Sequence, residues 1–143
     1  MRESEDHSIQ VIAASADLFD GDPDSDRVDC ANVLDLKFIL SQSSGATGTA
    51  TITISKHTAD AAAGTAIDFE YRTVSDAGVV GAWTAIAAAT GYPTIAGAEK
   101  TVEFRVKLKE LGDTYRYVYL TATELVDSAV AGIVTAQLKK RTV

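Results

Sequence analysis

The sequence predicts an all-β protein, a single antiparallel β-sandwich or jelly-roll-like domain with about seven to nine short strands and an N-terminal arm. Three observations favour this class. Apolar and polar residues alternate in several short segments, most clearly over 101–109, as they do on strands with one buried face. Turns rich in glycine, serine and aspartate separate these segments about every ten residues. No long segment has the periodicity of an amphipathic helix.

The first third of the chain is expected to hold an arm, two strands and a loop. Residues 1–8 are polar and are expected to form a flexible N-terminal arm, so the sandwich domain is expected over 9–143. Residues 9–14 form a weak first strand. Glycine and proline interrupt the Asp-rich segment 17–29, which is therefore predicted to be a loop. Residues 32–41 alternate leucine and phenylalanine with a mixed set of residues, which predicts a strand covered on both faces.

The remaining two thirds of the sequence predict short strands joined by turns. Residues 43–48 and 75–78 have turn composition, and 87–98 is expected to be a loop. The alanine-rich segment 58–64 is too short for a helix that stands alone. Alternation on both sides of a Gly-Asp turn predicts a hairpin over 101–124. Further strands are expected over 50–56, 67–72, 79–86 and 130–138.

Size and charge limit the functions that the chain can have. Its 143 residues fit one domain. The net charge is −7, so repulsion from phosphates disfavours nucleic acid as a partner. No apolar run approaches the roughly 20 residues of a membrane-spanning helix, so no membrane partner is expected. Residues 1–35 hold ten acidic side chains and two arginines, whereas 99–143 holds eight basic and six acidic ones. This imbalance would suit head-to-tail contacts or docking on a protein surface of mixed charge, but taken alone we interpret it as a solvated surface that serves solubility.

The start of the chain and its cysteine content favour a protein that stays in the cell that makes it. Residues 1–10 are polar and lack the apolar centre of a secretory signal. Cys30 is the one cysteine, so no disulfide can form within the chain, which suits a reducing cytoplasm. We expect Cys30 to be a small buried apolar residue and not a nucleophile.

The acidic loop is a weak candidate for a calcium site, because oxygen-rich loops bind this ion. The twelve-residue calcium loop requires glycine at its sixth position and glutamate at its twelfth, where this chain has Ser25 and Ala31. A solvated loop, or a loop that meets a basic surface of a partner, is the alternative. The four candidate ligands are Asp20, Asp22, Asp24 and Asp26.

No pattern in the sequence indicates an enzyme, and neither a catalytic residue nor a cofactor is expected. The two histidines, His7 and His57, lie 50 residues apart, outside any metal-ligand spacing, and are expected to be exposed. No serine lies in a nucleophile-elbow motif and no glycine-rich phosphate loop occurs.

The aromatic residues allow two interpretations. Tyr115, Tyr117 and Tyr119 share one face of a predicted strand, and Trp83 and Tyr92 precede it in the sequence. An exposed aromatic strip can stack on sugar rings, which would suit a glycan-binding sandwich. Aromatic rings also bury large areas in cores and subunit contacts, and we prefer this second interpretation.

Five segments in a fixed order resemble a group of small virion proteins of tailed bacteriophages. AGTAIDFEYRT (63–73) is followed by GAW (81–83), an alternating strand, LGDTYRYV (111–118) and a last strand that begins VAG (130–132). In that group, a segment similar to AGTAINFxYR precedes a Gly/Asp turn, WGAWT, a strand, YRYVxLxxTE and a valine-rich last strand. The resemblance covers about residues 47–138. This chain ends in LKKRTV, where the group has leucine and a short end with proline.

The resemblance implies a capsid decoration (cement) protein, a structural protein that binds and stabilises the phage head by protein–protein contacts. The implied partners are the major capsid protein and further copies of the chain, as a homo-oligomer with a trimer favoured. The implied location is the capsid surface of the virion, after assembly in the cytoplasm of a bacterial host. A neck or tail accessory protein and a virion-surface glycan-binding module are the alternatives.

We expect the arm over 1–14 or the tail over 139–143 to reach a neighbouring subunit. Edge strands and exposed aromatic residues provide the other expected contacts. The predicted partner-contact residues are Ile9, Val11, Trp83, Tyr92, Lys139, Lys140 and Arg141.

Overall fold

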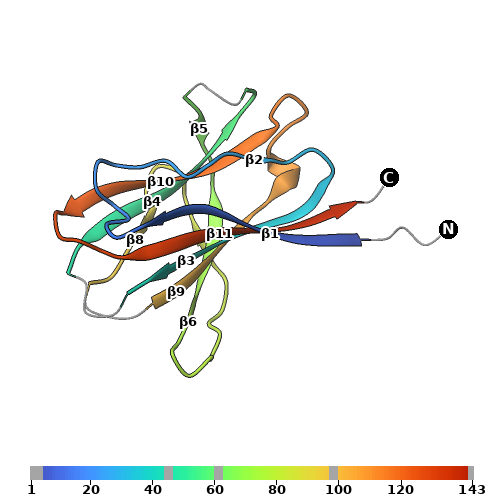
Figure 1. The fold of residues 1–143 in the computed structure, drawn as a ribbon. Helices are drawn as coiled ribbons and strands as arrows, with labels where there is room; N and C mark the ends of the chain where they lie inside the picture. Colours follow the sequence, from blue (N-terminus) through green and yellow to red (C-terminus); the bar gives the residue numbers. More distant parts are fainter. Residues whose placement is uncertain (1–4, 44–46, 60–62, 97–99, 142–143) are drawn as a thin grey trace.

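Two antiparallel β-sheets pack face to face in the computed structural model, which describes residues 5–43, 47–59, 63–96 and 100–141 (Figure 1). The first sheet has the strand order β1 (Glu5–Ser15), β11 (Gly132–Arg141), β3 (Val33–Gln42), β9 (Lys100–Val106), β6 (Phe69–Val74) and β7 (Thr84–Ile86). The second has the order β2 (Val28–Asp29), β10 (Tyr117–Val126), β4 (Thr49–His57) and β5 (Thr65–Ala66), and β8 (Tyr92–Pro93) also pairs with β4.

The helical content of the described ranges is a single 3₁₀ turn, η1 (Leu108–Glu110). Within those ranges, no helix is long and apolar enough to cross a membrane.

The strands are connected as in a jelly roll. The chain folds as one long hairpin, so that β1 pairs with β11, β2 with β10, β3 with β9 and β4 with β5. The strands of this hairpin are shared between the two sheets, and β11 and β10 also lie beside β3 and β4. The β6–β7 hairpin extends the first sheet beyond β9. The predicted all-β sandwich of jelly-roll type is therefore confirmed.

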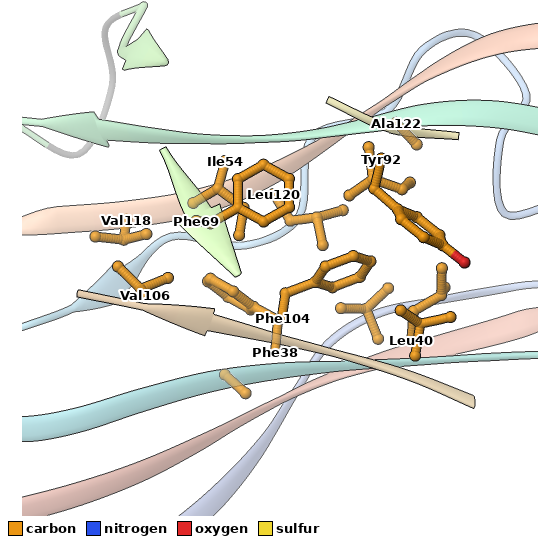
Figure 2. Close-up of a cluster of buried hydrophobic side chains, with 14 of the residues drawn as sticks. Phe38, Leu40, Ile54, Phe69, Tyr92, Phe104, Val106, Val118, Leu120 and Ala122 are labelled. Carbon is orange, nitrogen blue, oxygen red and sulfur yellow. The ribbon is translucent and has the colours of Figure 1, made fainter. Parts of the chain in front are cut away.

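Apolar residues from facing strands of both sheets form one core (Figure 2). Phe38 on β3 lies opposite Phe104 on β9, and both side chains are fully buried. The ring of Phe104 meets the rings of Phe69 and Tyr92 at steep angles, with centroids 5.7 and 5.4 Å apart. Because strand side chains alternate between faces, the period-two pattern of the sequence places these residues inside. Figure 2 shows that the second sheet contributes Ile54, Val118, Leu120 and Ala122.

The first strand begins earlier than the sequence predicted. β1 starts at Glu5, because Glu5–Ser15 pairs along the whole of β11 in antiparallel register. The predicted arm over 1–8 is therefore wrong for residues 5–8, which belong to the sandwich. The rest of that arm, residues 1–4, lies outside the described residues.

The hairpin predicted over 101–124 is wrong, because β9 and β10 lie in different sheets and pair with other strands. Several shorter segments also differ from expectation. Eleven strands occur in the described ranges, and β2, β5 and β8 are only two residues long, too short to produce an alternation. Within 79–86 only β7 is a strand, and the residues before it are limited to an isolated bridge between Val80 and Val74 and a backbone bond from the Gly81 N–H to Thr73 of β6. The turn expected over 43–48, the alanine-rich segment 58–64 and the loop 87–98 each lie partly outside the described residues.

Candidate functional site

The outer strand of the first sheet has an open edge. β1 pairs with β11 on one side, and no described strand pairs with its other side. The backbone N–H and C=O groups along that side therefore lack a sheet partner within the described residues. Such an edge is a template on which a strand of another chain can pair. The β1 edge, as we call it, consists of this open side of Glu5–Ser15 and its exposed apolar side chains.

Two apolar side chains of the β1 edge face solvent. Ile9 is 68% exposed and Val11 is 60% exposed. They lie opposite Gln137 and Thr135 of β11, on the face of the sheet that turns away from the core. A bulge between Val11 and Ala13 changes the alternation, so that Ala13 packs against the core. The register therefore displays the two apolar residues that the sequence predicted as partner contacts.

Ion pairs cross the outer face of the same sheet. The Lys37 ammonium on β3 lies 2.7 Å from a carboxylate oxygen of Glu103 on β9, and Arg72 on β6 donates to the other oxygen. One row further, the Nε of Arg105 donates to Glu70 at 2.8 Å. Burial alone would raise the pKa of Glu103, but the hydrogen bonds from Arg72 and Lys37 outweigh it and hold the pKa below its ordinary value. We call these five residues the ion-pair ladder.

Trp83 covers one end of the ladder. The guanidinium carbon of Arg72 lies 4.4 Å from the indole ring centroid, and that of Arg105 lies 4.5 Å from it. Both cations thus contact the ring that a sugar would need for stacking. The indole is half-buried. That Trp83 contacts a partner therefore stays a prediction. The surface beside it that a partner could reach is the adjoining pocket.

This pocket is a hollow of about 250 Å³ on the outer face. Its lining comes from β3, β6, β9 and β11 and from Trp83, which precedes β7, and four cations but only one carboxylate take part. We call it the Trp83 pocket. The side chains around it are Asp35, Lys37, Arg72, Trp83, Arg105, Gln137, Leu138 and Lys139.

Tyr92 lies in the core, although the sequence predicted it as a partner contact. It is 4% exposed, and its ring packs against Tyr71 with centroids 4.6 Å apart. Burial raises the pKa of its hydroxyl, with a smaller contribution from Tyr71. A groove of about 470 Å³ runs beside the two rings, and its rim includes Pro93 and the exposed Ile95. Only this rim is open to a partner.

The three tyrosines that were expected on one strand each contact a cation. β10 begins at Tyr117, so Tyr115 lies outside the strand. Lys56 lies 4.1 Å from the Tyr115 ring centroid, Arg116 lies 5.5 Å from that of Tyr117, and Arg27 lies 4.5 Å from that of Tyr119. Tyr119 is also buried, and its hydroxyl accepts a hydrogen bond from the backbone of Gly64. This arrangement favours a structural role for the tyrosines over an open stacking platform.

The acidic loop lies along the outer side of β10. The backbone N–H of Ser25 donates to Leu120 at 2.8 Å, and the Ser25 hydroxyl accepts from the Leu120 N–H at 3.0 Å. The N–H of Ala122 donates to Pro23 at 3.1 Å. The loop therefore covers backbone groups of β10 beyond the short strand β2.

The four aspartates proposed as calcium ligands do not converge. Asp22 accepts a hydrogen bond from the backbone of Glu124, and Asp24 accepts one from the Thr121 hydroxyl, each at 2.6 Å. Asp20 and Asp26 are exposed. Among the described residues, no three His, Cys, Asp or Glu side chains are placed to hold a metal ion. Asp22 and Asp24 therefore have hydrogen-bonding roles in the fold, and the four weak metal candidates do not form a common site.

The basic end of the chain belongs to the sheet. Lys139, Lys140 and Arg141 lie within β11, opposite His7, Asp6 and Glu5 of β1. The predicted tail over 139–143 is therefore a strand as far as Arg141, because pairing with β1 and β3 continues to that point, and residues 142–143 lie outside the described residues.

His57 and Cys30 have structural environments. His57 is buried, not exposed as predicted, because its Nδ1 accepts a hydrogen bond from the backbone of Ala59 at 2.8 Å. Burial raises the pKa of the Cys30 thiol to about 12, and the Asp29 charge adds to the effect. The side chain of His7 lies outside what the structure describes.

The ion-pair ladder was not predicted, although the sequence contains its signal. Glu70 and Arg72 are two residues apart, as are Glu103 and Arg105. Two strands with the same Glu-x-Arg order form two opposite-charge pairs when they run antiparallel, and β6 and β9 do so.

No protein-family model, curated protein or solved structure matches this chain. The fold and the surfaces described above therefore carry the functional argument.

Proposed function

We propose that this protein is a structural component of a tailed-phage virion that decorates and stabilises the head through protein–protein contacts. Its partners in this proposal are the major capsid protein and further copies of itself. We propose no enzymatic role for the chain.

The β1 edge is the observation that carries the proposal. It is an eleven-residue strand whose outer side pairs with no strand of the described residues. It also carries two apolar side chains, Ile9 and Val11, that are mostly exposed to water. Soluble proteins usually shield a long edge with charged side chains, proline or a bulge. β1 has acidic residues at its start and a bulge after Val11, but the stretch from Ile9 to Val11 between them has neither charge nor proline. An assembly partner that adds a strand there would satisfy the backbone groups and bury Ile9 and Val11.

Two further observations support a scaffold over a glycan-binding module. The rings of Trp83, Tyr115, Tyr117 and Tyr119 contact cations, and Tyr92 is in the core. The jelly roll is a common architecture of viral capsid domains, which is an argument from analogy, since lectins share it.

The test replaces the apolar residues of the β1 edge. Ile9→Asp/Val11→Asp is expected to lower the number of copies that pellet with heads lacking the protein by at least tenfold, because it puts charge where a partner strand would pack. Val79→Asp/Val80→Asp makes the same chemical change at exposed positions of the β6–β7 turn and should bind like the wild type. Circular dichroism checks that both variants fold. Undiminished binding by a folded Ile9/Val11 variant would refute the role of this edge.

A neck or tail accessory protein would use the same kind of surface. The pelleting experiment therefore includes purified tails beside heads. Binding to tails alone would indicate that the protein is located on the tail of the virion and not on the head.

A further inference from the structure

The Trp83 pocket concentrates positive charge on an acidic protein. Lys37, Arg72, Arg105 and Lys139 line it, against one carboxylate in the lining, Asp35. Glu103 and Glu70 pair with three of these cations, Lys37, Arg72 and Arg105. Basic side chains thus gather at this pocket, although the chain as a whole carries a net charge of −7.

Donor groups in this pocket remain available to an anion. Arg72 uses its Nε for Glu103, and Arg105 uses Nε and Nη2 for the single oxygen Oε2 of Glu70. A guanidinium has five N–H donors, so each arginine keeps donors beyond these bonds. Trp83 holds both guanidinium groups in place, and the Gln137 amide adds further polar groups to the wall. Oriented guanidinium donors beside an aromatic ring suit a carboxylate.

A surface of opposite charge lies at one end of the sandwich. Burial raises the pKa of Glu124, and the charges that add to this effect are those of Asp127, Asp17, Asp20 and Asp22. All of these neighbours are carboxylates, so the cluster repels itself. We call these five residues the acidic end.

A turn presents the acidic end to solvent. The N–H of Asp22 bonds back to Phe19, and Gly21 has a φ of 74°, a value that glycine adopts without strain. A Cβ at Gly21 would meet no atom within 4 Å, so the tip of this turn is open. Asp20 and Asp127 are exposed there.

The two surfaces are too far apart to meet within one chain. Asp17 bonds to the backbone of Val130, just before β11, whereas Gln137 lines the pocket seven residues further along. At about 3.3 Å per residue the separation is roughly 23 Å, more than twice the screening length in physiological salt. In Figure 1 the start of β11 lies at one end of the sandwich and its last residues at the other, beside the chain termini.

We propose that the acidic end of one copy docks in the Trp83 pocket of a second copy. The contact is head-to-tail, with the turn at Asp20 placing carboxylates against Arg72 and Arg105. Such a contact uses two different surfaces, so an open chain of copies keeps one unsatisfied surface at each end until a ring closes, and a trimer is one such ring. This inference deepens the proposed function by naming the contact between copies, and its test needs no phage head.

The test uses one variant for each surface. Asp20→Lys/Asp127→Lys reverses charge at the acidic end, at two exposed positions whose carboxylates make no hydrogen bond within the described residues. Gln137→Glu adds a carboxylate inside the pocket without removing an ion pair. Matched controls place the same changes elsewhere, as Asp76→Lys/Asp113→Lys and as Thr65→Glu, all at exposed positions. Light scattering after size-exclusion chromatography gives the mass at about 100 µM protein, in about 25 mM and about 500 mM salt.

In low salt we expect the wild type and both controls to have a mass above the monomer mass of 15.1 kDa. In high salt their mass should approach that of the monomer, because the affinity between copies should be at least about tenfold weaker there than in low salt. Each surface variant alone should stay monomeric. An equimolar mixture of the two should form pairs of twice the monomer mass and nothing larger, because one intact surface of each kind remains.

Three results would overturn the inference: a monomeric wild type in low salt, a surface variant that assembles like the wild type, or a mixture of variants that does not pair. If the wild type is monomeric but still binds heads, the contact between copies is refuted and the proposed function is not. If the protein assembles as expected but does not bind heads, the proposed function is refuted and the contact between copies is not.

Discussion

Replacing Glu103 with glutamine tests the energetics of the ion-pair ladder. The change keeps the shape of the side chain but removes the charge that holds Lys37 and Arg72. The Glu103 side chain is 11% exposed, whereas those of Lys37 and Arg72 are 22% and 26% exposed. Breaking a fully buried pair costs about 3–5 kcal/mol, and the two cations can partly rehydrate here. We therefore expect a loss of about 2–3 kcal/mol in the free energy of unfolding at pH 7.

Urea denaturation at a series of pH values measures this difference. The folded-state pKa of Glu103 lies below its ordinary value, so its contribution is present above the unfolded-state pKa and is lost as the pH falls through the folded-state pKa. The wild type and Glu103→Gln should accordingly differ most near neutral pH and converge in acid. Asp76→Asn, at an exposed turn, should cost less than about 0.5 kcal/mol at any pH. A difference that is equally large at pH 7 and in acid would refute the electrostatic explanation.

Two further substitutions and one alkylation experiment test the fold. Phe104→Ala should lower the free energy of unfolding by about 4 kcal/mol in urea, because a fully buried ring with two ring contacts is removed, and a loss below about 1.5 kcal/mol would contradict the core described here. Gly91→Ala should cost at least about 2 kcal/mol by thermal denaturation, since φ is 66° and a Cβ would lie 2.8 Å from the Ile52 carbonyl; an unchanged transition would contradict this. Iodoacetamide should alkylate Cys30 at least about tenfold more slowly in the native protein than in urea at pH 8, because burial disfavours the thiolate, and equal rates would show an accessible thiol.

The sequence was sufficient to predict the fold class, because an alternation with period two indicates which residues face inward. The segment 101–109 predicted β9, and its apolar positions Val102, Phe104 and Val106 are all in the core. Ile9 and Val11 were predicted as partner contacts, and the same alternation accounts for their position on one exposed face of β1. It did not reveal that the strand continues to Glu5, since polar residues enter β1 only because β11 is there to pair with them.

Features that depend on neighbours in space were harder to predict. The acidic loop resembled a solvated segment, yet its backbone and Ser25 bond to β10, a strand about 95 residues away in the chain. His57 was expected to be exposed and is buried, because its ring accepts a bond from the turn that follows. The charge order of Glu70-x-Arg72 and Glu103-x-Arg105 was visible, but it becomes informative only once β6 and β9 are known to be antiparallel neighbours.

The most direct test of the proposed function is to count copies on the phage head. Heads that lack the protein are incubated with it, pelleted, and analysed for the ratio of bound protein to the major shell protein. We predict saturation at a fixed ratio, together with heads that resist heat better than undecorated ones. Absence of binding to heads, with the protein recovered on purified tails or on neither particle, would contradict the account.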